Sequence, residues 1–140
     1  MTTDAERLIG DWRLASLFTE DVETNERTDV YGEKPDGHLG VSPAGRFYGL
    51  ITPRQRNAPQ SAEEQAAVWR AMLAYTGKLR LDGEKFVVAV DAAWNKAWVG
   101  TEQIRFWRIE GSKLFITSAP IPNPNAAGRM MIGTLIWERE

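Results

Sequence analysis

Residues 75–93 have the sequence YTGKLRLDGEKFVVAVDAA, in which two largely apolar, alternating segments flank an Asp-Gly pair. An Asp-Gly pair in this setting is among the strongest short-range signals for a β-hairpin. We therefore predict strands at residues 75–81 and 85–93, joined by a tight turn at Asp82-Gly83. The same kind of pattern extends from this hairpin in both directions along the chain.

Downstream, further strands are predicted at residues 100–109 and 113–119, on either side of Glu110-Gly111-Ser112. This short connection with a glycine is typical of a second hairpin. A loop rich in proline and asparagine at residues 120–128 then leads to a last strand at residues 129–139. The second half of the chain is therefore predicted to consist mainly of β-strands.

Upstream, residues 37–42 and 46–52 flank the turn-forming triplet Pro43-Ala44-Gly45 and are predicted to form another hairpin. Residues 11–18 alternate as well, with the heavier apolar side chains at the even positions. Together these segments make eight strands, and a closed barrel of eight strands can hold one small ligand. We predict an all-β, eight-stranded up-and-down antiparallel barrel, with an open sandwich as the alternative.

One helix is predicted between the third and fourth strands, after a polar loop at residues 53–60. Ser61 and Glu64 have the spacing of a capping box, and apolar residues recur at helical spacing past Trp69. A helix over residues 62–75 would be about 21 Å long. We expect it to lie across one open end of the barrel, and packing on the outside of the sheet is the alternative.

The composition limits the classes of partner. The chain has 140 residues, 43% of them hydrophobic, which fits one globular domain over residues 1–140. With 17 basic and 19 acidic side chains, it has no positive surplus to bind nucleic acid. The polar amino terminus and the lack of a bilayer-length apolar segment predict a cytoplasmic protein that does not enter membranes.

The chain also lacks the usual residues of cofactor and metal chemistry. It has no cysteine, which excludes disulfides and thiolate catalysis, and no glycine-rich phosphate-binding motif. Its one histidine, His38, follows Pro35-Asp36-Gly37 and is expected at a surface turn rather than in acid-base catalysis. We therefore predict no metal and no organic cofactor.

Several segments together resemble a known family. They are LIGDWRL at residues 8–14, YGEKPDG at 31–37, YTGK at 75–78, WVGTEQIR at 98–105 and LIWER at 135–139. This pattern resembles the lipocalin-like domain family of small bacterial and fungal proteins. The resemblance implies a calycin-type barrel with a ligand cavity, and it implies neither a cofactor nor established catalytic residues.

Alternation predicts which side chains face the cavity. On the strand at residues 101–109, the face with Gln103, Arg105 and Trp107 is the better candidate for the interior. Inside a barrel, the Arg105 charge needs a partner, which a bound anion could supply. The alternative is that Arg105 packs on Trp12 or Trp137 and closes one end of the core, as a paired arginine and tryptophan do in lipocalins.

Two sets of residues follow from this reasoning. The candidates for ligand contact are Trp12, Phe47, Tyr48, Trp69, Tyr75, Gln103, Arg105 and Trp107. The predicted interior wall consists of Trp12, Leu14, Phe18, Phe47, Leu79, Val88, Trp107, Leu114, Ile116 and Leu135. Weaker candidates are Ser16 as a polar contact, Trp94 and Trp98 at the cavity mouth, and Arg54 and Arg56 as attractors of an anionic ligand.

Three functions remain open at this point. The first is binding or transport of a small hydrophobic or aromatic molecule in the barrel. The second is a cofactor-independent isomerase or cyclase, in which Arg105 and Gln103 would polarise a carbonyl while Tyr75 or Tyr48 moves a proton. The third is a scaffold with a filled core, and assembly into a homodimer is left open in each case.

Overall fold

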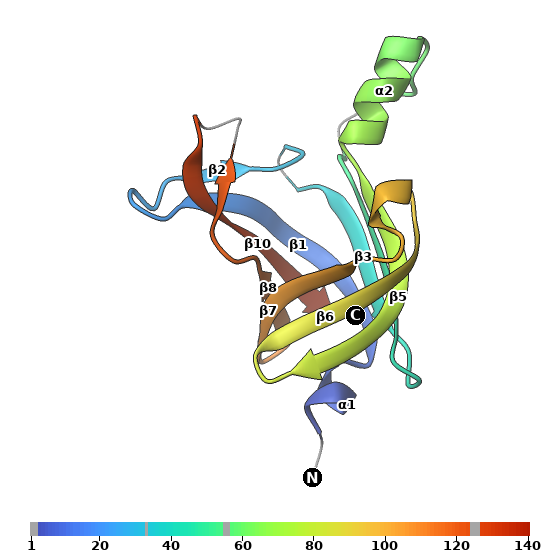
Figure 1. Ribbon diagram of the computed structural model, residues 1–140, viewed down its shortest axis with the longest axis vertical. Coiled ribbons are helices and arrows are strands. Elements are labelled where there is room, and N and C mark those ends of the chain that lie inside the picture. Colours follow the sequence, from blue (N-terminus) through green and yellow to red (C-terminus); the bar gives the residue numbers. More distant parts are fainter. Residues whose placement is uncertain (1–2, 33, 55–56, 124–126) are drawn as a thin grey trace.

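The computed structural model describes residues 3–32, 34–54, 57–123 and 127–140, and most of its elements are antiparallel β-strands (Figure 1). The barrel strands are β1 (Gly10–Asp21), β3 (Asp36–Val41), β4 (Arg46–Thr52), β5 (Leu73–Asp82), β6 (Lys85–Ala93), β7 (Glu102–Glu110), β8 (Lys113–Thr117) and β10 (Arg129–Arg139). They pair in this order, and β1 also pairs with β10, which closes the sheet. The predicted closed barrel of eight antiparallel strands is confirmed.

Several short elements were not predicted. Strands β2 (Arg27–Asp29) and β9 (Ile121–Asn123) pair with the outer parts of β1 and β10, away from the barrel wall. Helix α1 (Asp4–Leu8) precedes the first strand, and the 3-10 helix η1 (Lys96–Trp98) follows β6. Each is too short to give a periodic sequence signal.

The two predicted hairpins of the second half form as expected. In each one, two residues connect the last paired positions, which are Asp82↔Lys85 between β5 and β6 and Glu110↔Lys113 between β7 and β8. The first connecting residue is a glycine with positive φ, +60° at Gly83 and +59° at Gly111. Glycine adopts this conformation without steric cost, so it favours a two-residue hairpin loop.

A bulge in β1 changes which side chains face the core. Leu14 pairs with Trp137, but the next pair is Ser16↔Ile136, so the alternation shifts by one residue. Leu17 therefore packs against the core, whereas Phe18 lies on the outer face. The predictions of Phe18 in the interior wall and Ser16 as an inward polar contact are wrong for this reason.

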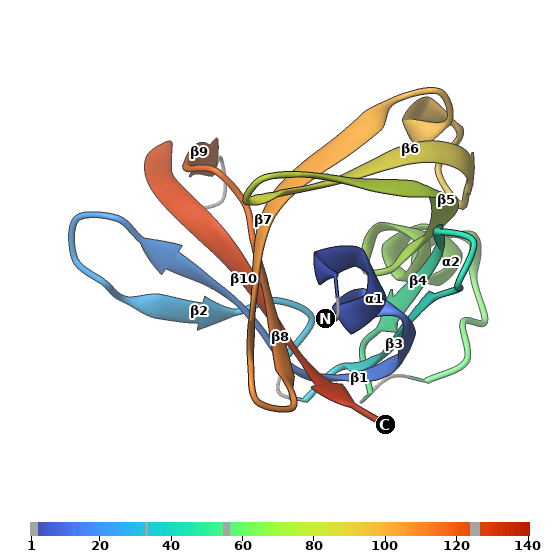
Figure 2. The same ribbon diagram turned by 90° about the horizontal axis from the view of Figure 1, so that it is seen from below.

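One end of the barrel is closed by α1, which lies across it when the molecule is seen from below (Figure 2). Leu8 of this helix is fully buried, and its carbonyl accepts a hydrogen bond of 3.0 Å from the indole Nε1 of Trp12. The guanidinium of Arg139 stacks on the Trp12 ring, 4.1 Å from its centroid. Arg139, and not Arg105, therefore forms the arginine-tryptophan pair that closes the barrel.

Helix α2 (Ala62–Arg70) begins where the capping residues predicted, since the Ser61 hydroxyl accepts a hydrogen bond from the Glu64 amide. It ends earlier than predicted, because Leu73 already pairs with Ile51 of β4. None of its residues is buried, and it projects beyond the barrel end opposite α1 (Figure 1). The expectation that it lies across the opening is wrong, and so is the alternative of a helix packed on the sheet.

The core lies inside the barrel. Its buried members are Leu8, Trp12, Leu14, Leu39, Val41, Phe47, Ile51, Phe86, Val88, Val90, Leu114, Ile116 and Trp137. Within the described ranges, no helix combines the length and the apolar composition needed to cross a membrane.

Candidate ligand-binding cavity

A cavity of about 70 Å³ lies inside the barrel. Its wall consists of Leu39, Phe47, Gly49, Ile51, Leu73, Tyr75, Phe86, Gln103, Arg105, Ile116, Leu135 and Trp137. These residues come from β3 to β8 and β10, and most of them belong to the buried core or pack against it. The wall is thus mainly aliphatic and aromatic, as ligand cavities in barrels are.

Gln103 and Arg105 are the polar members contributed by β7. Arg105 is half-buried, whereas its neighbour Ile104 is 46% exposed on the outer face, as alternation predicted. The Arg105 Nη1 donates to the Ile104 carbonyl at 2.8 Å, and Nη2 donates to the Gln103 Oε1 at 3.4 Å. These contacts orient the guanidinium but leave its charge without a counter-ion.

Arg105 has no carboxylate partner in the described part of the chain, unlike Arg80 and Arg108 on the outer face of the barrel. Among residues 3–32, 34–54, 57–123 and 127–140, no carboxylate oxygen lies within 4.0 Å of its guanidinium. The half-buried Arg46, on the outer face, instead contacts the Asp91 carboxylate at 2.8 Å. A partly desolvated positive charge without such a partner favours an anionic ligand.

Tyr75 places a hydroxyl in the same cavity. Burial raises the pKa of this phenol to about 12, and the nearby Arg105 charge lowers it only in part. The phenol therefore stays protonated at neutral pH. No hydrogen bond joins its hydroxyl to any other residue that the structure describes, so its proton is available to a ligand.

Trp137 also belongs to the cavity wall, and its side chain carries an indole N–H. Its side chain is 2% exposed, and its indole Nε1 is buried without a hydrogen-bond partner among the described residues. A buried donor without a partner costs about 1–3 kcal/mol. Sequence reasoning weighed Trp137 as core and as a partner for Arg105, but did not place it in the ligand set.

Aromatic rings connect the cavity to the surface at the end where α2 projects. Centroid distances along this series are 5.9 Å for Phe86 to Phe47, 4.9 Å for Phe47 to Tyr75, 5.2 Å for Tyr75 to Trp98, 5.0 Å for Trp98 to Trp94 and 6.2 Å for Trp94 to Trp69. Trp94 also donates from Nε1 to the Trp69 carbonyl at 3.1 Å. The aromatic series thus links the cavity residue Tyr75 to the base of α2.

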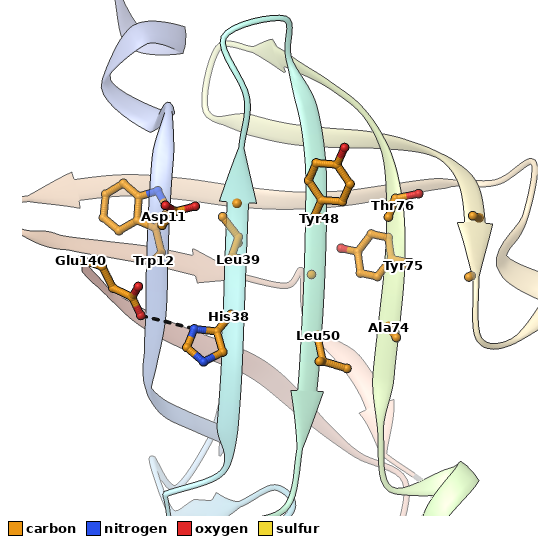
Figure 3. A pocket seen from close by; sticks show the side chains of 14 residues that line it. Asp11, Trp12, His38, Leu39, Tyr48, Leu50, Ala74, Tyr75, Thr76 and Glu140 are labelled. Atoms are coloured by element: carbon orange, nitrogen blue, oxygen red, sulfur yellow. Dashed lines mark ion pairs between the residues drawn. The ribbon is translucent and has the colours of Figure 1, made fainter.

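A larger hollow of about 720 Å³ lies outside the barrel, over β1 and β3 to β6 (Figure 3). Tyr48 and Leu50 border it from outward positions of β4 and are 51% and 46% exposed. His38 also borders it, and its Nδ1 lies 3.3 Å from the Glu140 carboxylate. The prediction of Tyr48 as an inner contact is wrong, whereas His38 is exposed as expected.

The remaining candidates lie outside the interior cavity. Trp12 is buried beneath Arg139, and Trp107 donates from Nε1 to the Gly83 carbonyl at 3.2 Å, at the β5–β6 turn. Trp69 is 46% exposed on α2. Arg54 pairs with Asp36 at 2.9 Å, and Arg56 lies outside the described residues.

No group of three or more acidic or histidine side chains that could hold a metal ion occurs within the described part of the chain. The prediction that no metal binds stays a prediction.

A closed, eight-stranded up-and-down antiparallel barrel is the architecture of lipocalins. The model of the lipocalin-like domain family matches residues 9–140, so the chain belongs to this family. No curated protein matches the sequence.

Proposed function

We propose that the protein binds a small, largely apolar molecule inside the barrel. The observation that supports this most directly is the interior cavity, whose apolar wall carries a few polar groups contributed by Gln103, Arg105 and Tyr75. Apolar walls with a small number of oriented polar groups are typical of ligand sites. The outer hollow is larger, but it is open to solvent, so polar contacts there are weaker.

The size of the cavity limits the ligand. Pockets for drug-sized molecules have volumes of roughly 300–1,000 Å³, far more than the 70 Å³ of this cavity. The ligand is therefore a small molecule, or its remainder extends toward the end opposite α1, past Tyr75 and Trp98. The aromatic series at that end provides an apolar surface for such an extension.

The enzymatic alternative has less support. A general base works best when its pKa lies near the working pH. Burial raises the pKa of Tyr75 to about 12, so this side chain does not accept a proton from a substrate at neutral pH. Tyr48 lies on the outer face, away from Arg105.

Binding of toluene, followed by thermal unfolding, tests the proposal. A ligand that binds only the folded state raises the unfolding temperature in a concentration-dependent way. We expect this rise in the wild-type protein and its loss in Ile116→Phe, because the larger side chain fills the cavity. Leu50→Asp changes the outer hollow and is expected to leave the rise unchanged.

The reverse pattern, with toluene binding lost in Leu50→Asp and kept in Ile116→Phe, would place the ligand outside the barrel. If toluene does not raise the unfolding temperature at any concentration up to its solubility limit, the result would favour the scaffold with a filled core.

A further inference from the structure

We propose that the cavity selects molecules whose polar end is a carboxylate, which Arg105 binds as the counter-ion and Tyr75 binds as a second donor. This inference rests on the proposed function and adds the chemical class of the ligand. It depends on three features of the cavity, which are its charge, its donors and the absence of competing acids from its wall.

The first feature is the positive charge of Arg105. Of the five N–H donors of a guanidinium, those in the two contacts described above donate to the Ile104 carbonyl and the Gln103 amide oxygen. Both acceptors are uncharged, so the positive charge stays uncompensated in a partly buried setting. A carboxylate matches the planar geometry of the guanidinium and neutralises it, which a neutral alcohol or ketone does not do.

The second feature is the set of donors on the wall. The Tyr75 hydroxyl remains protonated and, among the described residues, unbonded, and Arg105 keeps N–H groups beyond the two that donate to Ile104 and Gln103. In Gln103 the amide oxygen already accepts from Arg105, while its Nε2 donates to the Thr101 hydroxyl at 3.1 Å. The wall therefore offers donors in excess of acceptors, which suits an acceptor-only ligand group.

The third feature is the lack of like charge. No aspartate or glutamate belongs to the wall formed by the described residues, so a bound carboxylate meets no repulsion from it. The ion pairs of neighbouring β7 residues, Glu102 with Arg80 and Arg108 with Glu110, lie on exposed side chains. Arg105 is thus set apart from the surface network of the same strand.

The test compares hexanoate with hexanol, which have the same chain length and differ in the polar end. Affinities are measured at neutral pH by titration calorimetry. We expect the wild-type protein to bind hexanoate at least about tenfold more tightly, which corresponds to about 1.4 kcal/mol. Arg105→Met is expected to abolish this preference while leaving hexanol affinity within about twofold, because the apolar wall is retained.

Two matched controls keep charge and hydroxyl effects separate. Arg108→Met removes an arginine from the outer face of the same strand, and it is expected to preserve the preference for hexanoate. Tyr75→Phe is expected to weaken hexanoate binding about three- to tenfold, whereas Tyr48→Phe, on the exposed face, is expected to have no effect. Tyr75→Phe also serves if Arg105→Met does not fold, since it removes a single atom.

The outcomes distinguish the inference from the proposed function. Equal affinity for hexanoate and hexanol, or an equal loss in Arg105→Met and Arg108→Met, would overturn the carboxylate inference and leave binding in the barrel intact. If hexanoate, hexanol and toluene all fail to bind, the proposed function is wrong as well.

Discussion

The clearest structural prediction concerns Arg139, which holds the closed end of the barrel together. Its guanidinium lies 4.1 Å from the centroid of the Trp12 ring, and its Nη1 donates to the Ile9 carbonyl at 3.0 Å. Its Nη2 donates to the Arg7 carbonyl at the end of α1. We expect Arg139→Ala to loosen α1 and to lower the free energy of unfolding.

The expected magnitude follows from these contacts. An exposed cation–π contact contributes about 0.5–1 kcal/mol. Hydrogen bonds from a charged group contribute about 1.5–3 kcal/mol when shielded from water, and less here because the Arg139 side chain is exposed. Together they suggest a loss of about 2 kcal/mol, which lowers the melting temperature of a chain of this size by about 6 °C.

Urea unfolding followed by tryptophan fluorescence measures this loss. Arg139→Lys keeps the charge but cannot reach both carbonyls in the same geometry, so we expect it to recover about half of the stability. Arg13→Ala, an exposed position of β1, serves as the control and is expected to change stability by less than about 0.5 kcal/mol. A loss in Arg139→Ala no larger than in this control would refute the role of Arg139.

Three further changes test other parts of the structure. Gly77→Ala places a Cβ 2.2 Å from the Ala89 carbonyl oxygen, so we expect it to lower the free energy of unfolding in urea by about 3 kcal/mol or more. A loss below about 1 kcal/mol would show that the backbone moves apart at the register shift between Thr76 and Gly77 in the β5–β6 pair. Hydrogen bonds from the Glu23 and Thr24 amides lower the pKa of Asp21 below its ordinary value of 3.8. The Asp21 carboxylate therefore stabilises the fold fully at pH values above 3.8, and this stabilisation is lost as the pH falls through the lowered pKa. Asp21→Asn should therefore be less stable than wild type at neutral pH and converge with it in acid, whereas a difference independent of pH would exclude the carboxylate charge as its cause. Trp69→Ala should lower the free energy of unfolding by no more than about 1 kcal/mol, because α2 projects from the barrel. For the same reason we expect the rate and affinity of hexanol binding to stay unchanged. Slower or weaker binding would show that α2 covers the barrel opening.

Local patterns predicted the barrel because each hairpin is encoded by residues close together in sequence. Asp82-Gly83 and Glu110-Gly111-Ser112 specify turns directly, and closure then follows from antiparallel order. The bulge after Leu14 depends instead on how β1 meets β10, a partner at the other end of the chain. Alternation by itself could not reveal that shift, and Phe18 was therefore assigned to the wrong face.

The C-terminal end of α2 is also set by pairing with a strand that is distant in sequence. Helical spacing of apolar residues continues through Leu73, but this residue pairs with Ile51, and Tyr75 pairs with Gly49. Strand pairing with β4 outweighs the local helical pattern. The short α1 helix has a capping box at Thr3, a signal that sequence reasoning could have used.

The candidate site was predicted best where alternation was continuous. On β7, the inward assignment of Gln103 and Arg105 agrees with their place in the cavity wall. On β4, Phe47 and Tyr48 are adjacent and cannot both point inward, so only the first reaches the cavity. The closing role of Arg139 was missed because it requires the approach of both chain ends, which no local pattern encodes.

The position of a bound carboxylate tests the central claim most directly. With isotope-labelled hexanoate, nuclear Overhauser effects report which protein methyl groups lie near the ligand chain. We predict contacts with the methyl groups of Ile116 and Leu135, on the interior wall. Contacts confined to the Leu50 methyl groups, on the outer face, would contradict binding inside the barrel.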